Sequence, residues 1–127
     1  MYLVDTDIVI WCLRGKRECV EALQKIKVSG LAVSTITIAE VYKNVLPGEE
    51  VKTEGVLDEF EIIDLNTKIA KQAGLYWKQY FKKDRDILLF DCIVAATAVE
   101  YDLTLLTLNA KHYPMDGIKA SDPLKLK

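Results

Sequence analysis

Short apolar runs recur along the chain and alternate with longer segments whose apolar residues fall at helical spacing. The expected strands are residues 2–4, 31–34, 61–65, 103–107 and, most briefly, 118–119. Strands that are apolar throughout and separated by helices are typical of a mainly parallel sheet. The pattern therefore predicts one α/β domain, with a mainly parallel sheet of four or five strands flanked by helices on both faces.

The segments between these strands predict helices, several of them ended by glycine or proline. The expected helices are residues 8–14, 18–27, 35–45, 49–59, 67–82 and 91–101. Gly15 ends the first, Pro47 and Gly48 stop the third, and Asn66 or Thr67 caps the fifth. Since ligands of such folds bind beyond the carboxyl ends of the strands, polar residues at those ends are the candidates for a site.

Two aspartates, Asp5 and Asp7, stand in an apolar segment just after the first strand. An unpaired buried carboxylate is costly, so they need hydrogen bonds, an opposite charge or a metal ion. For Asp5, capping of the next helix by Asp5 or Thr6 and a functional role remain alternatives. Asp7 falls in the first helical turn, where the helix dipole favours a carboxylate, and we expect it to support a site.

Two further acids lie far along the chain. Asp91 interrupts the apolar segment 87–99, which favours a partly dry site with a counter-charge over a solvated surface, with helix capping as the alternative. Glu40 shares a helix face with Thr37 and Asn44, and a solvated surface is the ordinary interpretation of such a face. Asn109, just past the fourth strand, is equally at home in a turn.

The remaining residues exclude several kinds of chemistry. His112 is the only histidine and is expected on the surface of a helix, so no nucleophilic triad is evident, and the chain has no glycine-rich phosphate loop. Carboxylates gathered beyond strand ends suit a hard cation such as Mg²⁺. Two such ions would activate water and stabilise the leaving oxygen in phosphodiester hydrolysis. Asp5, Glu40 and Asp91 come from distant parts of the chain, as a site at the edge of a sheet would require.

Composition limits the class of protein. The chain has 127 residues, of which half are hydrophobic and 28% charged, as in an ordinary soluble domain. Its apolar runs are too short to span a membrane, no secretory signal is evident, and three cysteines without metal-site spacing predict reduced thiols in the cytoplasm. The formal net charge of −2 neither indicates nor excludes nucleic-acid binding, because acids can cluster around a cation and bases elsewhere.

Over nearly its whole length the chain resembles the PIN-domain ribonucleases of the VapC toxin type. The stretches LVDTDIVIW, STITIAEV and FDCIVAATAVEYDLTLLTLN match the acid-bearing motifs of that family in order, and the last is the most specific. The resemblance implies a PIN domain over residues 1–127 and an endoribonuclease that depends on Mg²⁺ or Mn²⁺. Its catalytic metal ligands would be Asp5, Glu40 and Asp91.

The same resemblance implies supporting residues and partners. Thr6 would orient the first acid, Thr107 would support the site by hydrogen bonding, and Asp7 and Asn109 would assist. Many relatives carry a fourth acid where this chain has Asn109, which predicts one metal at rest and a second arriving with the RNA. Toxins of this type usually form homodimers and are blocked by a VapB-type antitoxin whose tail occupies the active-site groove.

An acidic protein that cleaves RNA needs positive charge near its site. Arg14, Lys16 and Arg17 follow the first helix and are the expected phosphate contacts, because they are close in sequence to Asp5. A row of lysines along the long helix is the weaker candidate, since a solvated helix face explains it as well. That row consists of Lys68, Lys71, Lys78 and Lys82.

Two other functions compete with the nuclease. A haloacid-dehalogenase-type phosphatase also begins with a strand and Asp-x-Asp, with Asp5 as nucleophile and Asp7 as acid, but its downstream lysine and acidic pair are not evident here. An inactive PIN-like scaffold that binds RNA or a protein would have lost its acids, whereas all three principal positions are filled. Bound aspartyl-phosphate would mark the first alternative, and failure to bind Mn²⁺ would mark the second.

Overall fold

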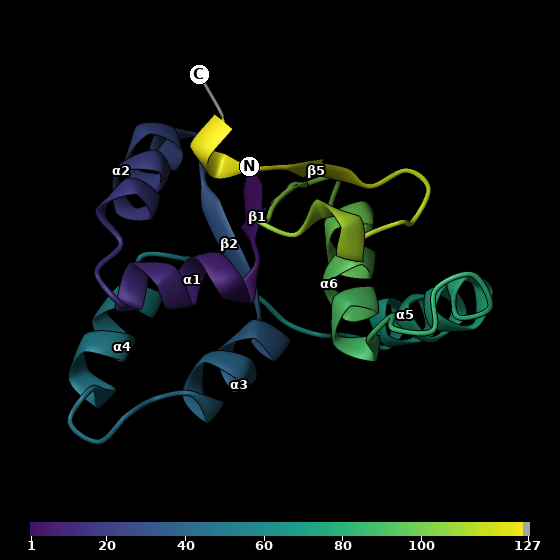
Figure 1. The fold of residues 1–127 in the computed structure, drawn as a ribbon, viewed down its shortest axis with the longest axis horizontal. Helices are drawn as coiled ribbons and strands as arrows, with labels where there is room; N and C mark the ends of the chain where they lie inside the picture. The colour runs from purple at the N-terminus through teal and green to yellow at the C-terminus, as the bar shows by residue number, and fades with distance from the viewer. Residues whose placement is uncertain (126–127) are drawn as a thin grey trace.

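In a computed structural model that describes residues 1–125, a five-stranded sheet lies between two groups of helices (Figure 1). The strand order is β3-β2-β1-β4-β5, and every neighbouring pair runs parallel. The strands are β1 (Tyr2–Val4), β2 (Leu31–Ser34), β3 (Glu61–Ile63), β4 (Thr104–Leu106) and β5 (Lys119–Ser121). The predicted fold class is therefore confirmed, with the fifth strand placed slightly later in the chain than expected.

The helices follow the predicted segments with shifted ends. They are α1 (Thr6–Leu13), α2 (Arg17–Ile26), α3 (Thr35–Lys43), α4 (Glu50–Leu57), α5 (Thr67–Tyr80) and α6 (Leu89–Glu100), with short 3₁₀ helices η1 (Lys27–Ser29), η2 (Ala110–His112) and η3 (Pro123–Lys125). Within the described part of the chain, no helix has the length and apolarity needed to cross a bilayer.

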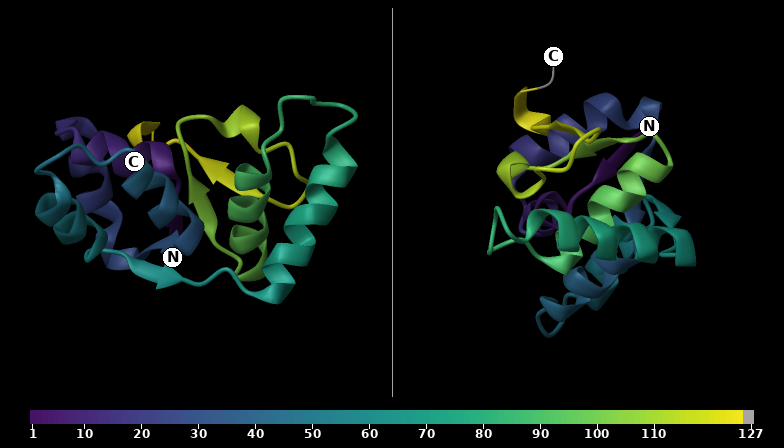
Figure 2. Two further views of the ribbon diagram at one scale, coloured as in Figure 1. Left: turned by 90° about the horizontal axis from the view of Figure 1, so that it is seen from below. Right: turned by 90° about the vertical axis from the view of Figure 1, so that its right-hand side faces the viewer.

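The two faces of the sheet bury separate apolar clusters because side chains alternate along each strand. Leu3 and Leu105 point to the cluster covered by α5 and α6, whereas Val4, Val33 and Leu106 point to the cluster beneath α1, α2, α3 and α4. Figure 2 shows these two groups of helices on opposite sides of the strands. Burial on both faces explains why the strands are apolar throughout.

Strands pass directly into helices at the carboxyl edge of the sheet. Asp5 caps α1 by accepting a hydrogen bond from the backbone N–H of Thr6, and Ser34 caps α3 through its hydroxyl, which accepts from the N–H of Ile36. Asn66 caps α5 as predicted. The cap at Asp5 starts α1 two residues earlier than apolar spacing suggested, which places Asp7 in its first turn.

Candidate active site

Asp5 is the centre of a buried hydrogen-bond network at the carboxyl edge of the sheet. Its Oδ1 accepts from the backbone N–H of Thr6 at 2.8 Å, while its Oδ2 accepts from the hydroxyls of Thr107 at 2.8 Å and Tyr113 at 2.7 Å. The capping and functional alternatives for Asp5 are thus compatible, because one oxygen caps the helix and the other meets residues from more than 100 positions later. Thr107 makes the supporting contact expected of it.

Asp91 comes to this network from α6. The helix begins at Leu89 and its N-cap position is Leu88, so Asp91 lies in the first turn and is not the cap. Tyr113 joins the two acids, since its hydroxyl oxygen also lies 3.4 Å from Oδ1 of Asp91. The capping alternative for Asp91 is therefore wrong, and the apolar sequence around it reflects a carboxylate set into a mostly buried site.

Glu40 reaches the same edge from α3. Its Oε1 accepts a hydrogen bond from the hydroxyl of Thr6 at 3.2 Å, so Thr6 contacts Glu40 through its side chain and Asp5 through its backbone N–H. The helix face that carries Glu40 is only partly solvated, because Glu40 is half-buried and Asn44 is exposed. Thr37, one turn earlier, is fully buried, and its hydroxyl is the one buried side-chain polar atom in residues 1–125 that lacks a hydrogen-bond partner.

Asp7 and Asn109 form a second link between α1 and the segment after β4. One oxygen of Asp7 accepts from the side-chain amide of Asn109 at 2.9 Å and from the N–H of Leu108 at 3.2 Å. The N–H of Asn109 in turn donates to the hydroxyl of Thr107 at 3.1 Å. Asn109 therefore holds Asp7 and Thr107 in place, which agrees with the supporting roles predicted for them.

The carboxylates repel one another, and burial strengthens this effect. Burial, followed by the charge of Asp5, raises the pKa of Asp7 to about 6, and burial with the charges of Asp5 and Glu40 raises the pKa of Asp91 to about 6. Burial, followed by the charges of Asp5 and Asp91, raises the pKa of Tyr113 far above its ordinary value. Its hydroxyl therefore stays protonated and donates a hydrogen bond. The site thus concentrates negative charge that a cation would neutralise.

The raised pKa values should make the stability of the metal-free protein depend on pH. Asp7 and Asp91 bind protons more tightly in the folded chain than in the unfolded chain, so the free energy of unfolding should fall as pH rises from about 4 to about 6 and then level off. At about 1.4 kcal/mol per pKa unit, each residue contributes about 1–3 kcal/mol. Urea unfolding of metal-stripped protein at stepped pH measures the effect.

The control for this measurement is the double variant Asp7→Asn, Asp91→Asn. Its advantage in stability over the unmodified protein should be small at pH 4 and should grow to its full size by pH 7. A difference that stays constant across this range would contradict the raised pKa values.

The side chains gathered here are of the chemical type that binds a hard divalent cation. Asp5, Glu40 and Asp91 offer carboxylate oxygens from three separate segments, and Mg²⁺ and Mn²⁺ prefer such ligands. No group of three His, Cys, Asp or Glu side chains in residues 1–125 is already close enough to enclose an ion. Because Tyr113 stands between Asp5 and Asp91, a cation that bound both would require these side chains to turn toward one another.

The basic residues predicted to contact RNA differ in whether their charge is already paired with an acid. Arg14 makes two 3.0 Å contacts with the carboxylate of Glu49, so its charge is already paired. Lys16 lies 4.3 Å from the ring centroid of Trp11, and Arg17 is exposed. Lys68, at the start of α5, pairs with Glu100. The cluster after α1 therefore offers Lys16 and Arg17 as its available cations.

Two residues at the site were missed or misjudged from the sequence. Tyr113 gave no signal, because a tyrosine after a short polar stretch looks like an ordinary core residue. His112 was expected on a surface helix, and half of its side chain is exposed, but its Nδ1 lies 3.9 Å from Oδ2 of Asp91. His112 ends the short 3₁₀ helix η2 and Tyr113 follows it directly, in a segment after Asn109 that folds back over the acids.

Comparison with known proteins agrees with this fold. A model of the PIN domain family matches residues 2–118. Ribonuclease VapC10 of Mycobacterium tuberculosis is 34% identical over 116 residues, which cover 91% of this chain and 87% of that protein. A toxin–antitoxin complex from Klebsiella pneumoniae contains a chain that is 29% identical, with a TM-score of 0.77 and coverage of 97% of this chain and 98% of that one.

A DNA-bound VapBC structure from Salmonella typhimurium shares the fold with a TM-score of 0.82 at 23% identity, over 96% of this chain and 97% of that chain. The family match covers every segment that supplies the candidate site, from Asp5 to Tyr113. This chain therefore belongs to the PIN domain family and groups with its VapC-type members.

Proposed function

We propose that the protein is a metal-dependent endoribonuclease and the toxin of a VapBC-type toxin–antitoxin pair. The observation that carries the proposal is the gathering of Asp5, Glu40 and Asp91 at one edge of the sheet, where Tyr113 and Thr6 connect them. The names of the related ribonuclease VapC10 and of the similar toxin–antitoxin complex support it.

The residues of the chain have distinct tasks in this proposal. Asp5, Glu40 and Asp91 hold Mg²⁺ or Mn²⁺, and such an ion supplies a bound water of lowered pKa together with positive charge for the phosphate. Thr107 and the Thr6 N–H fix the orientation of Asp5, and the Thr6 hydroxyl fixes that of Glu40. Hydrolysis of the phosphodiester would leave a 5′-phosphate and a 3′-hydroxyl.

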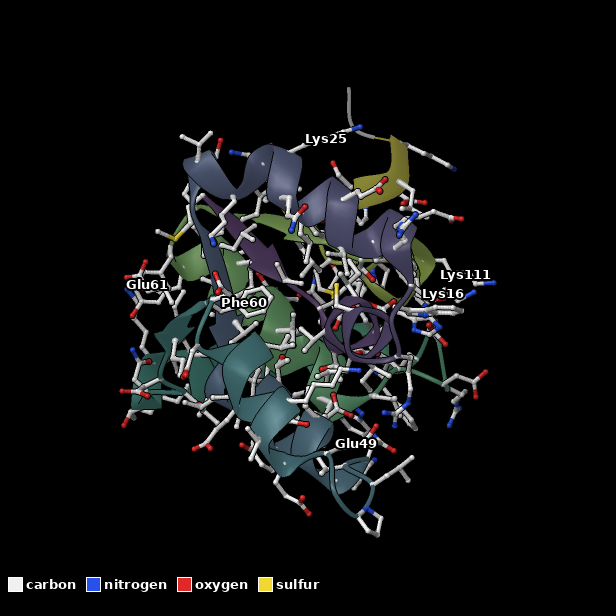
Figure 3. The ribbon with its side chains drawn as sticks, turned by 90° about the vertical axis from the view of Figure 1, so that its left-hand side faces the viewer. Lys16, Lys25, Glu49, Phe60, Glu61 and Lys111 are labelled. Carbon is white, nitrogen blue, oxygen red and sulfur yellow. The ribbon has the colours of Figure 1, made fainter. Side chains whose placement is uncertain are left out.

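The proposed antitoxin needs a surface on which to pack. An open groove of about 390 Å³ lies between α2 and α4, and its apolar lining includes Val20, Leu23, Leu31, Val56 and Phe60. Figure 3 shows Phe60 between these two helices. Leu23, Leu31 and Phe60 are buried and Val20 and Val56 are half-buried, so the groove offers a small apolar contact, which we assign to an apolar segment of the antitoxin. A homodimer completes the proposed assembly.

The phosphatase alternative loses its support. The chain matches the PIN family over residues 2–118. In addition, both carboxylate oxygens of Asp5 accept hydrogen bonds in a buried network, which makes this side chain a poor nucleophile.

Metal removal tests the function directly. We expect purified, antitoxin-free protein to cleave mixed cellular RNA with Mn²⁺ or Mg²⁺, to lose all cleavage in chelator, and to recover it when Mn²⁺ is restored in excess. The products should carry 5′-phosphate ends, which a phosphate-dependent exonuclease detects. Cleavage that persists after complete chelation would refute the metal-dependent mechanism. A folded protein that neither cleaves RNA nor binds Mn²⁺ would be the inactive scaffold.

A further inference from the structure

The C-terminal end of α5 carries an aromatic stack that the site described above does not use. The rings of Trp77 and Phe81 lie 4.3 Å apart, with an interplanar angle of 22°. The guanidinium carbon of Arg85 lies 5.0 Å from the centroid of the Phe81 ring. Trp77 remains 36% exposed, so part of its ring meets solvent on the side away from Phe81.

This stack lies among unpaired cations. Lys78, Lys82 and Lys83 join Arg85 on the last turn of α5 and the loop after it, and none of the four forms an ion pair within residues 1–125. The loop also contains two aspartates, one of which accepts a hydrogen bond from the backbone of the other. The local charge is therefore positive in a chain whose net charge is −2.

The same segment adjoins the candidate active site. The loop after α5 leads directly into α6, whose first turn carries Asp91. The hydroxyl of Tyr80, on the last turn of α5, accepts a hydrogen bond from the N–H of Asp116 at 3.0 Å, three residues after Tyr113. Figure 2 (left) shows the α5–α6 connection on the same edge of the molecule as η2.

We propose that Trp77, Phe81 and the cations around them bind a single-stranded segment of the RNA substrate and lead it toward Asp91. This inference rests on the proposed ribonuclease function and deepens it. Aromatic rings stack on bases of any sequence while lysine and arginine hold the phosphates, and a duplex does not present its base faces in this way. The surface thus selects unpaired RNA without reading its sequence.

A purely structural role is the competing explanation. Aromatic residues four positions apart on a helix stabilise that helix by themselves. In that case, loss of Trp77 would lower the stability of the protein and leave its affinity for RNA unchanged. Binding must therefore be measured separately from both folding and cleavage.

The experiment measures fluorescence anisotropy of a labelled single-stranded RNA of about twelve nucleotides, in chelator so that no cleavage occurs. We expect Trp77→Leu to weaken binding about fivefold to a hundredfold, in keeping with the loss of one stacked base. The double variant Lys82→Gln, Lys83→Gln should also lower the salt dependence of binding, by a slope of about 0.7 for each phosphate that is no longer neutralised. A duplex of the same sequence should bind more weakly and respond less to Trp77→Leu.

Matched controls lie away from the C-terminal end of α5. Tyr101→Leu removes a half-exposed aromatic ring beyond the C-terminal end of α6, and Lys25→Gln removes an exposed charge from α2. Both should bind RNA as the unmodified protein does. Quenching of Trp77 emission by RNA in a Trp11→Phe protein reports stacking directly, even if Trp77→Leu folds poorly.

The outcomes separate this inference from the proposed function. If the protein cleaves RNA with metal while Trp77→Leu binds single strands as tightly as before and Trp77 emission is not quenched, the inference is wrong and the nuclease stands. Equal losses of affinity in the Tyr101 and Lys25 controls would also overturn it. If the protein neither binds nor cleaves RNA, the proposed function itself fails.

Discussion

Replacing Asp91 with asparagine should reduce metal-dependent RNA cleavage by about a hundredfold or more while the metal-free protein becomes more stable. The substitution removes one of the three carboxylates from the site. It also removes a charge that burial and the neighbouring Asp5 make unfavourable, as the raised pKa of Asp91 shows. Cleavage rates with Mn²⁺, together with thermal unfolding in chelator, measure both effects on the same preparation.

The opposite signs of these two effects distinguish a functional acid from a structural one. Replacing an aspartate with a purely structural role would lower both stability and activity. The exposed Asp64, just after β3, is the matched control, and Asp64→Asn should change neither quantity. An Asp91→Asn protein that remained folded and fully active would remove Asp91 from the proposed catalytic set.

Tyr113→Phe should destabilise the metal-free protein by about 1.5–3 kcal/mol, because it removes a hydrogen bond to a charged group from a buried site. Tyr113 is 5% exposed and its hydroxyl donates to Asp5 at 2.7 Å. Phenylalanine preserves the shape of the ring, so the change isolates the hydroxyl. For a domain of this size the midpoint of thermal unfolding should fall by several degrees.

Tyr80→Phe provides a comparison within the same apolar cluster. Tyr80 is 7% exposed, and its hydroxyl accepts from the neutral N–H of Asp116. A neutral hydrogen bond contributes about 0.5–1.5 kcal/mol, so this variant should lose about half as much stability. If the two variants lost the same amount, the contact between Tyr113 and Asp5 would not be charge-assisted.

The sequence was most informative where burial and chemistry conflict. Asp5 and Asp91 stand in apolar surroundings, and that conflict identified both as parts of a site before the fold was known. Glu40 offered no such conflict, because helical spacing placed it on a polar face. Only the packing of α1 against α3, which brings Thr6 to Glu40, shows that the part of this face at Thr37 and Glu40 is covered.

Contacts between distant segments account for what could not be predicted. The hydroxyl of Tyr113 donates a hydrogen bond to Asp5, which lies 108 residues earlier in the chain. No local sequence pattern predicts a contact over that separation. Arg14 was a reasonable candidate for phosphate contact until the fold placed Glu49 beside it. The start of α1 shifted for the simpler reason that the cap at Asp5, and not apolar spacing, decides where this helix begins.

Asp5 and Asp7 contact residues about a hundred positions later in the sequence, and this separation affects how the site forms while the protein is being synthesised. Thr107, Asn109 and Tyr113 leave the ribosome about a hundred residues after Asp5 and Asp7, and at about 5–20 residues per second that interval lasts several seconds. A nascent chain that has not yet exposed β4 and the segment after it lacks the side chains that hold Asp5 and Asp7 in place. The proposed hydrolytic centre is therefore completed late in synthesis, which leaves an interval in which the unfinished chain is inactive.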